Sequence, residues 1–365
     1  MHPLVGILHF AIPSLIALTV LVFVHEMGHF WVARRNKVRV EVFSIGFGPE
    51  LFGWTDKHNT RWKFSALPLG GYVKMFGDAN AASAPDEMLA AMTPEERAVS
   101  FHHKKLSQRT AVVFAGPLAN IIFTFVVLTA LFATAGQPFT RPVVGGVLAD
   151  SPAARAGILP GDRIVEINGK EIERFQDIAQ TVQFALDEPL KIEILRDSNR
   201  ITLTLTPEIV EQKDNFGHSY KIGRLGLEST KDSEYVRYTP IVAARRAVEE
   251  MSFITVSSAK AIGQMFSGKR PFGEAGGPVR MGEWAAEAAS NGTASFLFLL
   301  AVLSLNLGLI NLLPIPMLDG GHLLFYAVEA VRRRPLAPRI QDYGFRIGLT
   351  LVLLLMIFVI WNDVT

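Results

Sequence analysis

Two histidines and a glutamate stand together in the segment HEMGH at residues 25–29. In a helix, His25 and His29 are four positions apart and share one face, so both imidazoles can bind the same zinc ion. Glu26 then lies about 100° further round the helix, beside the metal, where it can act as a general base toward water. The pattern predicts a catalytic zinc site, although two histidines packed between helices would also satisfy it.

A catalytic zinc ion usually has three protein ligands and one open position, so one more ligand must come from elsewhere. The segment NLLPIPMLDGGH at residues 311–322 offers a carboxylate. Its two prolines should interrupt a helix, and Asp319 should follow in a turn flanked by glycines. We expect Asp319 to be the third ligand, ahead of His322. Asn311 is expected to hold the substrate backbone or an oxyanion, and Asn306 to hydrogen-bond between helices.

Both ligand segments belong to apolar stretches. Hydrophobic residues make up 49% of the 365 residues, the net charge of +2 gives no indication of nucleic-acid binding, and the absence of cysteine excludes disulfides and thiolate zinc sites. Ionisable groups at membrane depth are costly, which favours a functional role for the histidines. The apolar stretch that contains HEMGH has no Lys or Arg before it and no cleavage site after it, which disfavours a signal peptide. Four stretches are long enough to span a bilayer: 5–33, 109–135, 294–315 and 344–361.

Basic residues predict the orientation of these spans, because cytoplasmic loops carry the excess of Lys and Arg. We expect 34–108 and 332–343 on the cytoplasmic side, and both termini and 136–293 outside. Spans one and three then run in the same direction, and their ligand-bearing ends meet. The residues concerned are Arg34, Arg35, Lys37, Arg39, Lys104, Lys105, Arg109, Arg332, Arg333, Arg334 and Arg339.

The segments between the spans predict small folded parts. Residues 38–48 and 61–76 indicate strands of a sheet at the cytoplasmic face, and 78–100 a surface loop with one short helix capped by Thr93. Residues 141–209 indicate a separate α+β domain, with turns at Asn168-Gly169 and around Ser198-Asn199. Residues 240–267 have the pattern of an amphipathic helix.

Three segments, HEMGH, GPLAN at 116–120 and NLLPIPMLDGG at 311–321, resemble in this order the site-2 protease family of intramembrane zinc metalloproteases, most closely the type of the regulator of sigma-E protease (RseP). The resemblance covers nearly the whole chain. SPAARAGILPGDRIVEINGK, at 151–170, is similar to the PDZ domains of that group. The type has two tandem PDZ domains, and only one is recognisable here.

The resemblance implies zinc (Zn²⁺) bound by His25, His29 and Asp319, with Glu26 as general base and Asn311 in a catalytic role. It implies hydrolysis of peptide bonds within transmembrane segments of single-span proteins, such as anti-sigma factors trimmed beforehand by another protease, in the bacterial inner membrane. The PDZ domain would bind a peptide in a groove between Gly145-Gly146-Val147 and the helix at 174–186, or exclude bulky substrates. We further expect the 38–76 strands to capture the opened substrate, with Val42 on an edge strand.

The sequence therefore predicts a multi-pass α-helical membrane protein with four transmembrane helices, a small cytoplasmic-side β-sheet and one extracytoplasmic PDZ (α+β) domain. Three alternatives are a membrane-anchored PDZ scaffold with a non-catalytic metal site, a membrane-bound protease that cuts soluble chains, and a metal transporter. A scaffold has no need for Glu26, which favours the enzyme. The expected parts are 1–35, 36–108, 109–135, 141–209, 235–292, 294–322 and 344–361.

Overall fold

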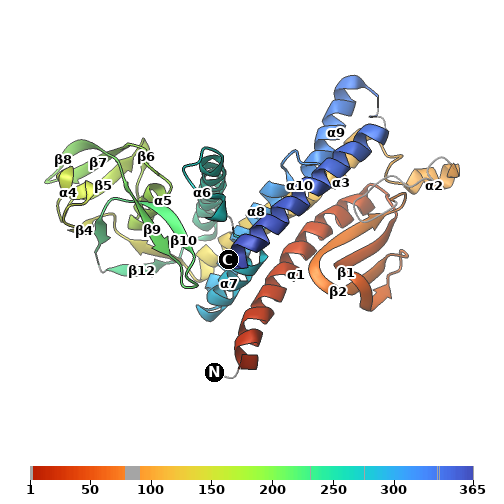
Figure 1. Cartoon of the computed structure of the whole chain (residues 1–365), viewed down its shortest axis with the longest axis horizontal. Coiled ribbons are helices and arrows are strands. Elements are labelled where there is room, and N and C mark those ends of the chain that lie inside the picture. The colour runs from red at the N-terminus through yellow and green to blue at the C-terminus, as the bar shows by residue number, and fades with distance from the viewer. Residues whose placement is uncertain are drawn as a thin grey trace. The chain divides into compact units, whose positions relative to one another are not determined.

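The computed structural model describes residues 3–78, 91–230, 232–274, 276–334, 336 and 338–364. It forms two compact units, one of Met1–Leu128 with Gly276–Thr365 and the other of Thr129–Ala275. Within the described residues, four helices are long and apolar enough to cross a membrane, in agreement with the four predicted spans (Figure 1). They are α1 (Pro3–Arg35), α3 (Leu106–Thr134), α8 (Thr293–Asn311) and α10 (Pro338–Val364).

Helix α7 (Pro278–Ser290) joins one end of the first unit. It packs against α1 and α8, and Ser14 of α1 donates a hydrogen bond to the Gly282 carbonyl at 3.2 Å. Asp363, near the end of α10, accepts hydrogen bonds from the backbone amides of Gly277 and Val279 at the start of α7. The beginnings of α1 and α8 and the end of α10 therefore meet here. The distribution of basic residues predicted the same three ends on one side of the membrane.

The opposite end of this unit carries basic residues that were predicted to be cytoplasmic, among them Arg34 and Arg109. Here the start of α3 meets another helix. Helix α9 (Asp319–Arg332) is tied to the start of α3 by an ion pair between Arg109 and Glu329 at 2.6 Å. The Arg109 guanidinium also lies 4.9 Å from the centre of the Tyr326 ring. Helix α2 (Pro94–Val99) begins with the predicted cap, since Thr93 and Glu96 form a capping box. Much of the loop predicted at 78–100 lies outside the described residues.

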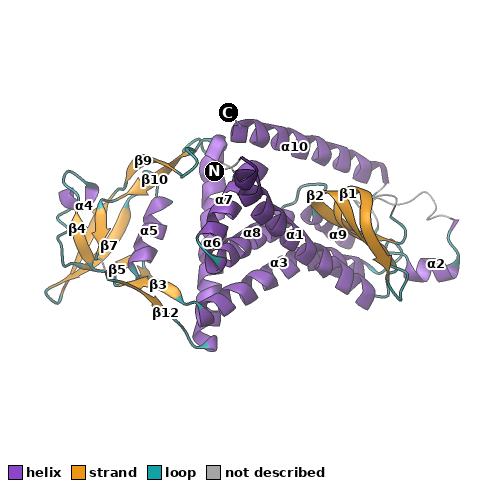
Figure 2. Ribbon diagram, turned by 90° about the horizontal axis from the view of Figure 1, so that it is seen from below, coloured by secondary structure: helices purple, strands orange, loops and turns teal. Residues whose placement is uncertain are grey.

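Strands β1 (Val40–Thr55) and β2 (Arg61–Met75) pack beside α1 (Figures 1 and 2). Val42 pairs with Lys74 on one side and with Arg61 on the other, because both strands bend and pair with each other twice. The sheet is therefore four strand segments wide. Residues 71–75 and 50–55 form its two edges. The prediction of strands here is confirmed, but the prediction that Val42 lies on an edge is wrong, because its segment is bonded on both sides.

The second unit is built around an antiparallel sheet of order β6-β5-β7-β8. Its core is aliphatic, with Ile164, Ile192 and Ile194 fully buried, and two-stranded sheets pair β4 with β11, β9 with β10, and β3 with β12. The strands are β3 (Gln137–Thr140), β4 (Val144–Val147), β5 (Arg163–Ile167), β6 (Lys170–Glu171), β7 (Leu190–Arg196), β8 (Asn199–Leu205), β9 (Glu208–Lys213), β10 (Ser219–Arg224), β11 (Leu227–Ser229) and β12 (Ser233–Val236). The helices are α4 (Pro152–Arg155), α5 (Phe175–Gln183) and α6 (Pro240–Phe266), with a 3₁₀ turn, η2 (Phe272–Glu274).

The predicted turns of this unit are nearly right. Asn168 and Gly169 both have positive φ between β5 and β6, as a tight hairpin with that sequence requires. The second turn is shifted by one residue, because Asp197 and Ser198 have positive φ and Asn199 already pairs with Arg196. Pairing of β11 with β4 carries the domain beyond residue 209, where the sequence pattern ended it.

Candidate metal centre

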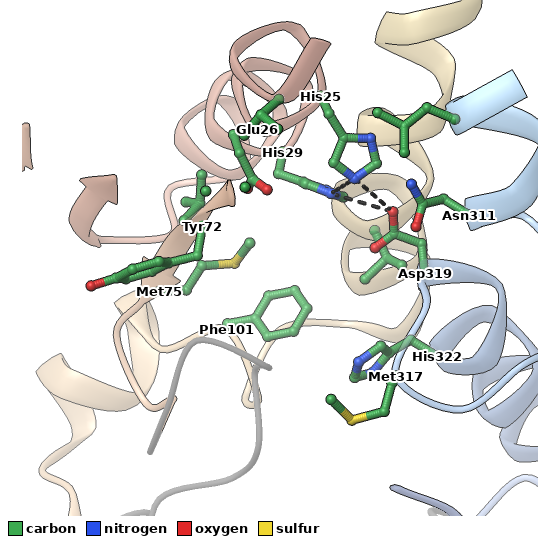
Figure 3. Close-up of a pocket in the computed structure, with 16 residues that line it drawn as sticks. His25, Glu26, His29, Tyr72, Met75, Phe101, Asn311, Met317, Asp319 and His322 are labelled. Carbon is green, nitrogen blue, oxygen red and sulfur yellow. Dashed lines mark hydrogen bonds and ion pairs between the residues drawn. The ribbon is translucent and has the colours of Figure 1, made fainter. Parts of the chain in front are cut away.

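Three side chains from two distant helices converge within the first unit (Figure 3). His25 Nε2 lies 3.2 Å from His29 Nε2, and the two atoms lie 3.2 and 3.4 Å from Asp319 Oδ2. Among the described residues, these three form the group of histidines and carboxylates that could hold a metal ion. The structure therefore brings together the three ligands expected from the sequence.

The triangle of ligand atoms fits zinc. Tetrahedral zinc with bonds of about 2.0–2.1 Å separates two ligand atoms by about 3.3 Å, which matches all three edges. Asp319 Oδ2 is buried and makes no hydrogen bond to a described residue, so a cation would satisfy it. Two imidazoles and one carboxylate are also the ligand set of a catalytic site that keeps one position open.

Close packing of α1 on α3 sets the positions of the histidines. A Cβ atom on Gly28 would lie 2.2 Å from the Ala115 carbonyl oxygen, and one on Gly116 would lie 2.2 Å from His29 Nε2. Only glycine leaves room for this approach. Helix α3 continues unbroken through Pro117.

Asp319 reaches the site at the start of a helix. Helix α8 ends at Asn311, residues 312–318 form an irregular segment, and Asp319 is the first residue of α9. The predicted turn around Asp319 is therefore wrong, although the predicted interruption after Asn311 is confirmed. Gly320 and Gly321 lie against the backbone of this segment, where a Cβ atom would come within 2.5 Å of carbonyl oxygens. These contacts fix the start of α9, and with it the carboxylate.

Glu26 lines a pocket of about 290 Å³ next to the ligands. In Figure 3, Glu26 and Asn311 lie on opposite sides of the ligand group, with Tyr72, Met75 and Phe101 on other walls. The Glu26 side chain lies against the edge segment 71–75, because a Cβ atom on Gly71 would be 3.5 Å from Glu26 Cγ. A substrate carbonyl near the metal would thus have a carboxylate on one side and an amide on the other.

The remaining residues from the sequence analysis have different positions. His322 also lines the pocket, but its ring lies 5.1 Å from the Phe345 ring, and it is not one of the three grouped ligands. Asn306 is on α8, and its expected role between helices stays a prediction. Sequence reasoning missed Asn120, a fully buried residue whose amide lies 3.2 Å from His25 Nδ1. The sequence feature that could have revealed it is that Asn120 is the single polar residue in GPLAN.

The groove expected in the second unit has a different wall. A pocket of about 260 Å³ lies between α5 and the segment 222–227, which includes the end of β10 and the start of β11. The predicted wall at Gly145-Gly146-Val147 is wrong, because β4 pairs with β11 and is separated from α5 by that segment.

Comparison with known proteins identifies the family. Residues 13–355 match Peptidase family M50. A protein of Mesorhizobium japonicum named as a zinc metalloprotease is 45% identical over 357 residues, which cover 96% of this chain and 97% of that protein. One of Rhizobium meliloti with the same description is 44% identical, covering 98% and 97%. Metalloprotease MmpA of Caulobacter vibrioides is 39% identical over 383 residues, covering 99% and 96%.

These matches extend over nearly the full chain and include both ligand segments. The geometry supplies a three-ligand site with an adjacent carboxylate, and the family supplies the metal and the reaction. The chain belongs to peptidase family M50 and is a zinc metalloendopeptidase.

Proposed function

We propose that this enzyme hydrolyses peptide bonds inside the transmembrane segments of other proteins. The observation that carries the proposal is the depth of the ligands along α1. His29 and His25 precede Arg34 by five and nine residues, which places them about 8 and 14 Å from the basic end of a candidate span. A bilayer has a hydrocarbon core of about 30 Å, so a substrate reaching this site would itself lie in the membrane.

The described residues suit hydrolysis of an opened backbone. When bound, zinc supplies a Lewis acid that polarises a carbonyl and makes water more acidic. Glu26 accepts the proton of the attacking water and returns it to the amide nitrogen as the C–N bond breaks. Asn311 lines the other side of the ligands, which supports a role in donating its amide N–H to the substrate carbonyl oxygen or to a neighbouring peptide group.

The sheet edge supports a way to hold the substrate extended. Peptide groups of a helix are already hydrogen-bonded, so the substrate must unwind before its carbonyl can be attacked. Residues 71–75 pair with β1 on one side only, and the Glu26 side chain lies against this segment. An unwound segment can add to this edge as a further strand next to the metal.

Disulfide trapping tests this strand addition, because the chain has no cysteine of its own. Tyr72→Cys places a thiol at the pocket edge, and Trp54→Cys places one on the opposite edge of the sheet as a matched control. The substrate carries a single cysteine at one of several positions around its cleavage site. Strand addition predicts that Tyr72→Cys crosslinks to cysteines at every second position, whereas Trp54→Cys does not. Equal trapping at both positions would exclude it.

The outer domain and the cellular setting complete the proposal. We assign 141–229 as a single PDZ-type domain of an RseP-like enzyme, supported by the groove between α5 and segment 222–227. It would filter single-span substrates, such as anti-sigma factors already shortened by another protease, by binding a peptide end or by excluding bulk. The distribution of basic residues supports an inner-membrane protein with this domain and both termini outside.

The experiment uses the purified full chain in detergent with a single-span substrate that carries a helix-breaking residue in its span. Wild type should cut inside the span, and Glu26→Gln should lose cutting by about 10²–10⁴-fold with zinc still bound. Cutting by both proteins would reject Glu26 as the base. Zinc-loaded wild type that cuts only the soluble flanks would reject the intramembrane proposal and favour a membrane-bound protease for soluble chains.

A further inference from the structure

Each metal-binding histidine has a second ring nitrogen that is held by α3. His29 Nδ1 lies 2.9 Å from the Val112 carbonyl oxygen, and His25 Nδ1 lies 3.2 Å from the side-chain amide of Asn120. The Nε2 atoms are the ones that face the ligand triangle. A neutral imidazole whose Nε2 lone pair binds a metal carries its proton on Nδ1, so each Nδ1 needs an acceptor.

The Asn120 side chain has an atom that meets this need. Asn120 is fully buried, its Nδ2 faces His25, and its Oδ1 is buried with no hydrogen-bond partner among the described residues. A half-turn of the amide exchanges the two atoms and aims Oδ1 at His25 Nδ1. In that orientation the unpartnered oxygen accepts the Nδ1 proton and leaves Nε2 free for the metal.

Helix α8 helps to hold Asn120 in place. The Asn120 carbonyl accepts hydrogen bonds from Ser304 of α8 at 3.2 Å and from Thr124 at 3.0 Å. A Cβ atom on Gly308 would lie 3.2 Å from Asn120 Cβ, so α8 packs tightly against this position. The residue is thus fixed by the helix that leads to Asn311 and Asp319.

We infer that Asn120 is a positioning residue for zinc: its side-chain oxygen accepts the His25 Nδ1 proton and sets the tautomer and orientation of that ligand. The Val112 carbonyl does the same for His29. One ligand is therefore oriented by a side chain that mutation can change, and the other by the backbone. Loss of such an orienting partner typically weakens metal binding by about 10–100-fold.

The test measures zinc affinity by competition with a chelator, and the absorption spectrum of the cobalt-substituted full-length protein. Asn120→Leu keeps the shape but removes the acceptor, and should weaken zinc binding about 10–100-fold and alter the cobalt spectrum. Asn120→Asp keeps an acceptor and removes the donor, and should bind zinc as tightly as wild type or more tightly. Thr110→Val, on the same helix, is the matched control, because the Thr110 hydroxyl bonds the Leu106 carbonyl of α3 and neither Asn120 nor His25. Its zinc affinity should be unchanged.

Two results would overturn the inference. One is wild-type zinc affinity in Asn120→Leu. The other is an Asn120→Asp protein that loses as much affinity as Asn120→Leu, since that would mean the amide acts as a donor. If Asn120→Leu does not fold, Asn120→Asp decides the matter: zinc affinity at or above that of Thr110→Val supports the inference, and an affinity about 10–100-fold lower overturns it.

Discussion

The largest core of the second unit contains only aliphatic side chains, whereas the packed helices of the first unit bury polar ones. Ile164 and Ile192 are fully shielded in the former. Where α1, α3 and α8 meet, the buried residues include His29, Asn120, Thr124 and Ser304. A soluble domain is stabilised by removing apolar surface from water, but lipid is as apolar as leucine. The helical unit can therefore bury hydrogen bonds and metal ligands beside its own apolar cluster, which includes Phe30, Phe43 and Phe101.

The outer surface of the helical unit includes one strongly apolar helix. Helix α10 exposes Leu353, Leu354 and Leu355, and only 6% of its apolar window is buried inside the unit. Apolar residues at these positions suit contact with acyl chains. Changes in the interior of the helical unit should thus affect the chemistry, and changes in the aliphatic core should affect folding.

Gly116→Ala should have the largest effect. The new Cβ atom would lie 2.2 Å from His29 Nε2, so the imidazole must move away from the other two ligands. A displacement of about 1 Å can reduce catalysis on the order of 100-fold, and zinc content should fall with it. Cleavage rate and bound zinc measure the effect.

Gly263→Ala is the matched control for that substitution. Gly263 is also helical, and a Cβ atom there meets nothing within 4 Å. It should leave cleavage and zinc content unchanged and raise helix stability by up to about 1 kcal/mol. Normal zinc content in Gly116→Ala would show that α1 and α3 are not as close as described.

Ile192→Ala should destabilise the second unit by about 2–5 kcal/mol, because it leaves a cavity in a closely packed core. Zinc affinity should stay at the wild-type value. Hydrogen exchange of the full-length protein, followed by mass spectrometry of peptides from 129–275, measures the stability. Faster exchange in peptides from α1 and α3 as well would mean that the two units unfold together.

Acid should weaken the second unit through Asp162. Burial alone would raise the pKa of its carboxyl, but bonds from Arg196 and from the Leu159 amide lower the pKa below its ordinary value. A lowered folded-state pKa stabilises the fold above the ordinary value of 3.8, and this contribution is lost as the pH falls through the lowered pKa.

The contribution is on the order of 1–3 kcal/mol. Asp162→Asn should reduce stability at neutral pH and flatten its dependence on acid, as measured by hydrogen exchange of 129–275 between pH 3 and 7. An equally steep acid dependence in Asp162→Asn would assign the effect to other carboxylates.

Leu354→Ala should have the smallest effect, below about 0.5 kcal/mol in detergent, since its side chain is 63% exposed. Thermal unfolding of the detergent-solubilised protein measures it. A loss as large as that of Ile192→Ala would show that this face of α10 packs against protein.

Local patterns predicted much of this molecule. The four spans, the capping box at Thr93 and the turn at Asn168-Gly169 depend on residues close together in the chain, and all are found. The spacing of His25 and His29 likewise fixes their shared helix face. The approach of Asp319 followed from charge distribution and an interrupted helix, although its place at a helix start did not.

Contacts between distant segments could not be predicted from local sequence patterns. No spacing rule says that Asn120 faces His25, because the rotation of α3 depends on Gly28 and Gly116 packing. The position of Val42 in the middle of a sheet depends on a bend that lets β1 pair twice with β2. The groove wall at 222–227 lies outside the segment whose pattern suggested the domain.

The most direct measurement is the position of the cleaved bond when the enzyme and a single-span substrate are reconstituted together in liposomes. Mass spectrometry of the products should place the cut inside the substrate span, about 8–14 Å from its cytoplasmic end, at the depth of His25 and His29. A cut confined to the soluble segments flanking the span would contradict the claim that the metal centre acts within the membrane.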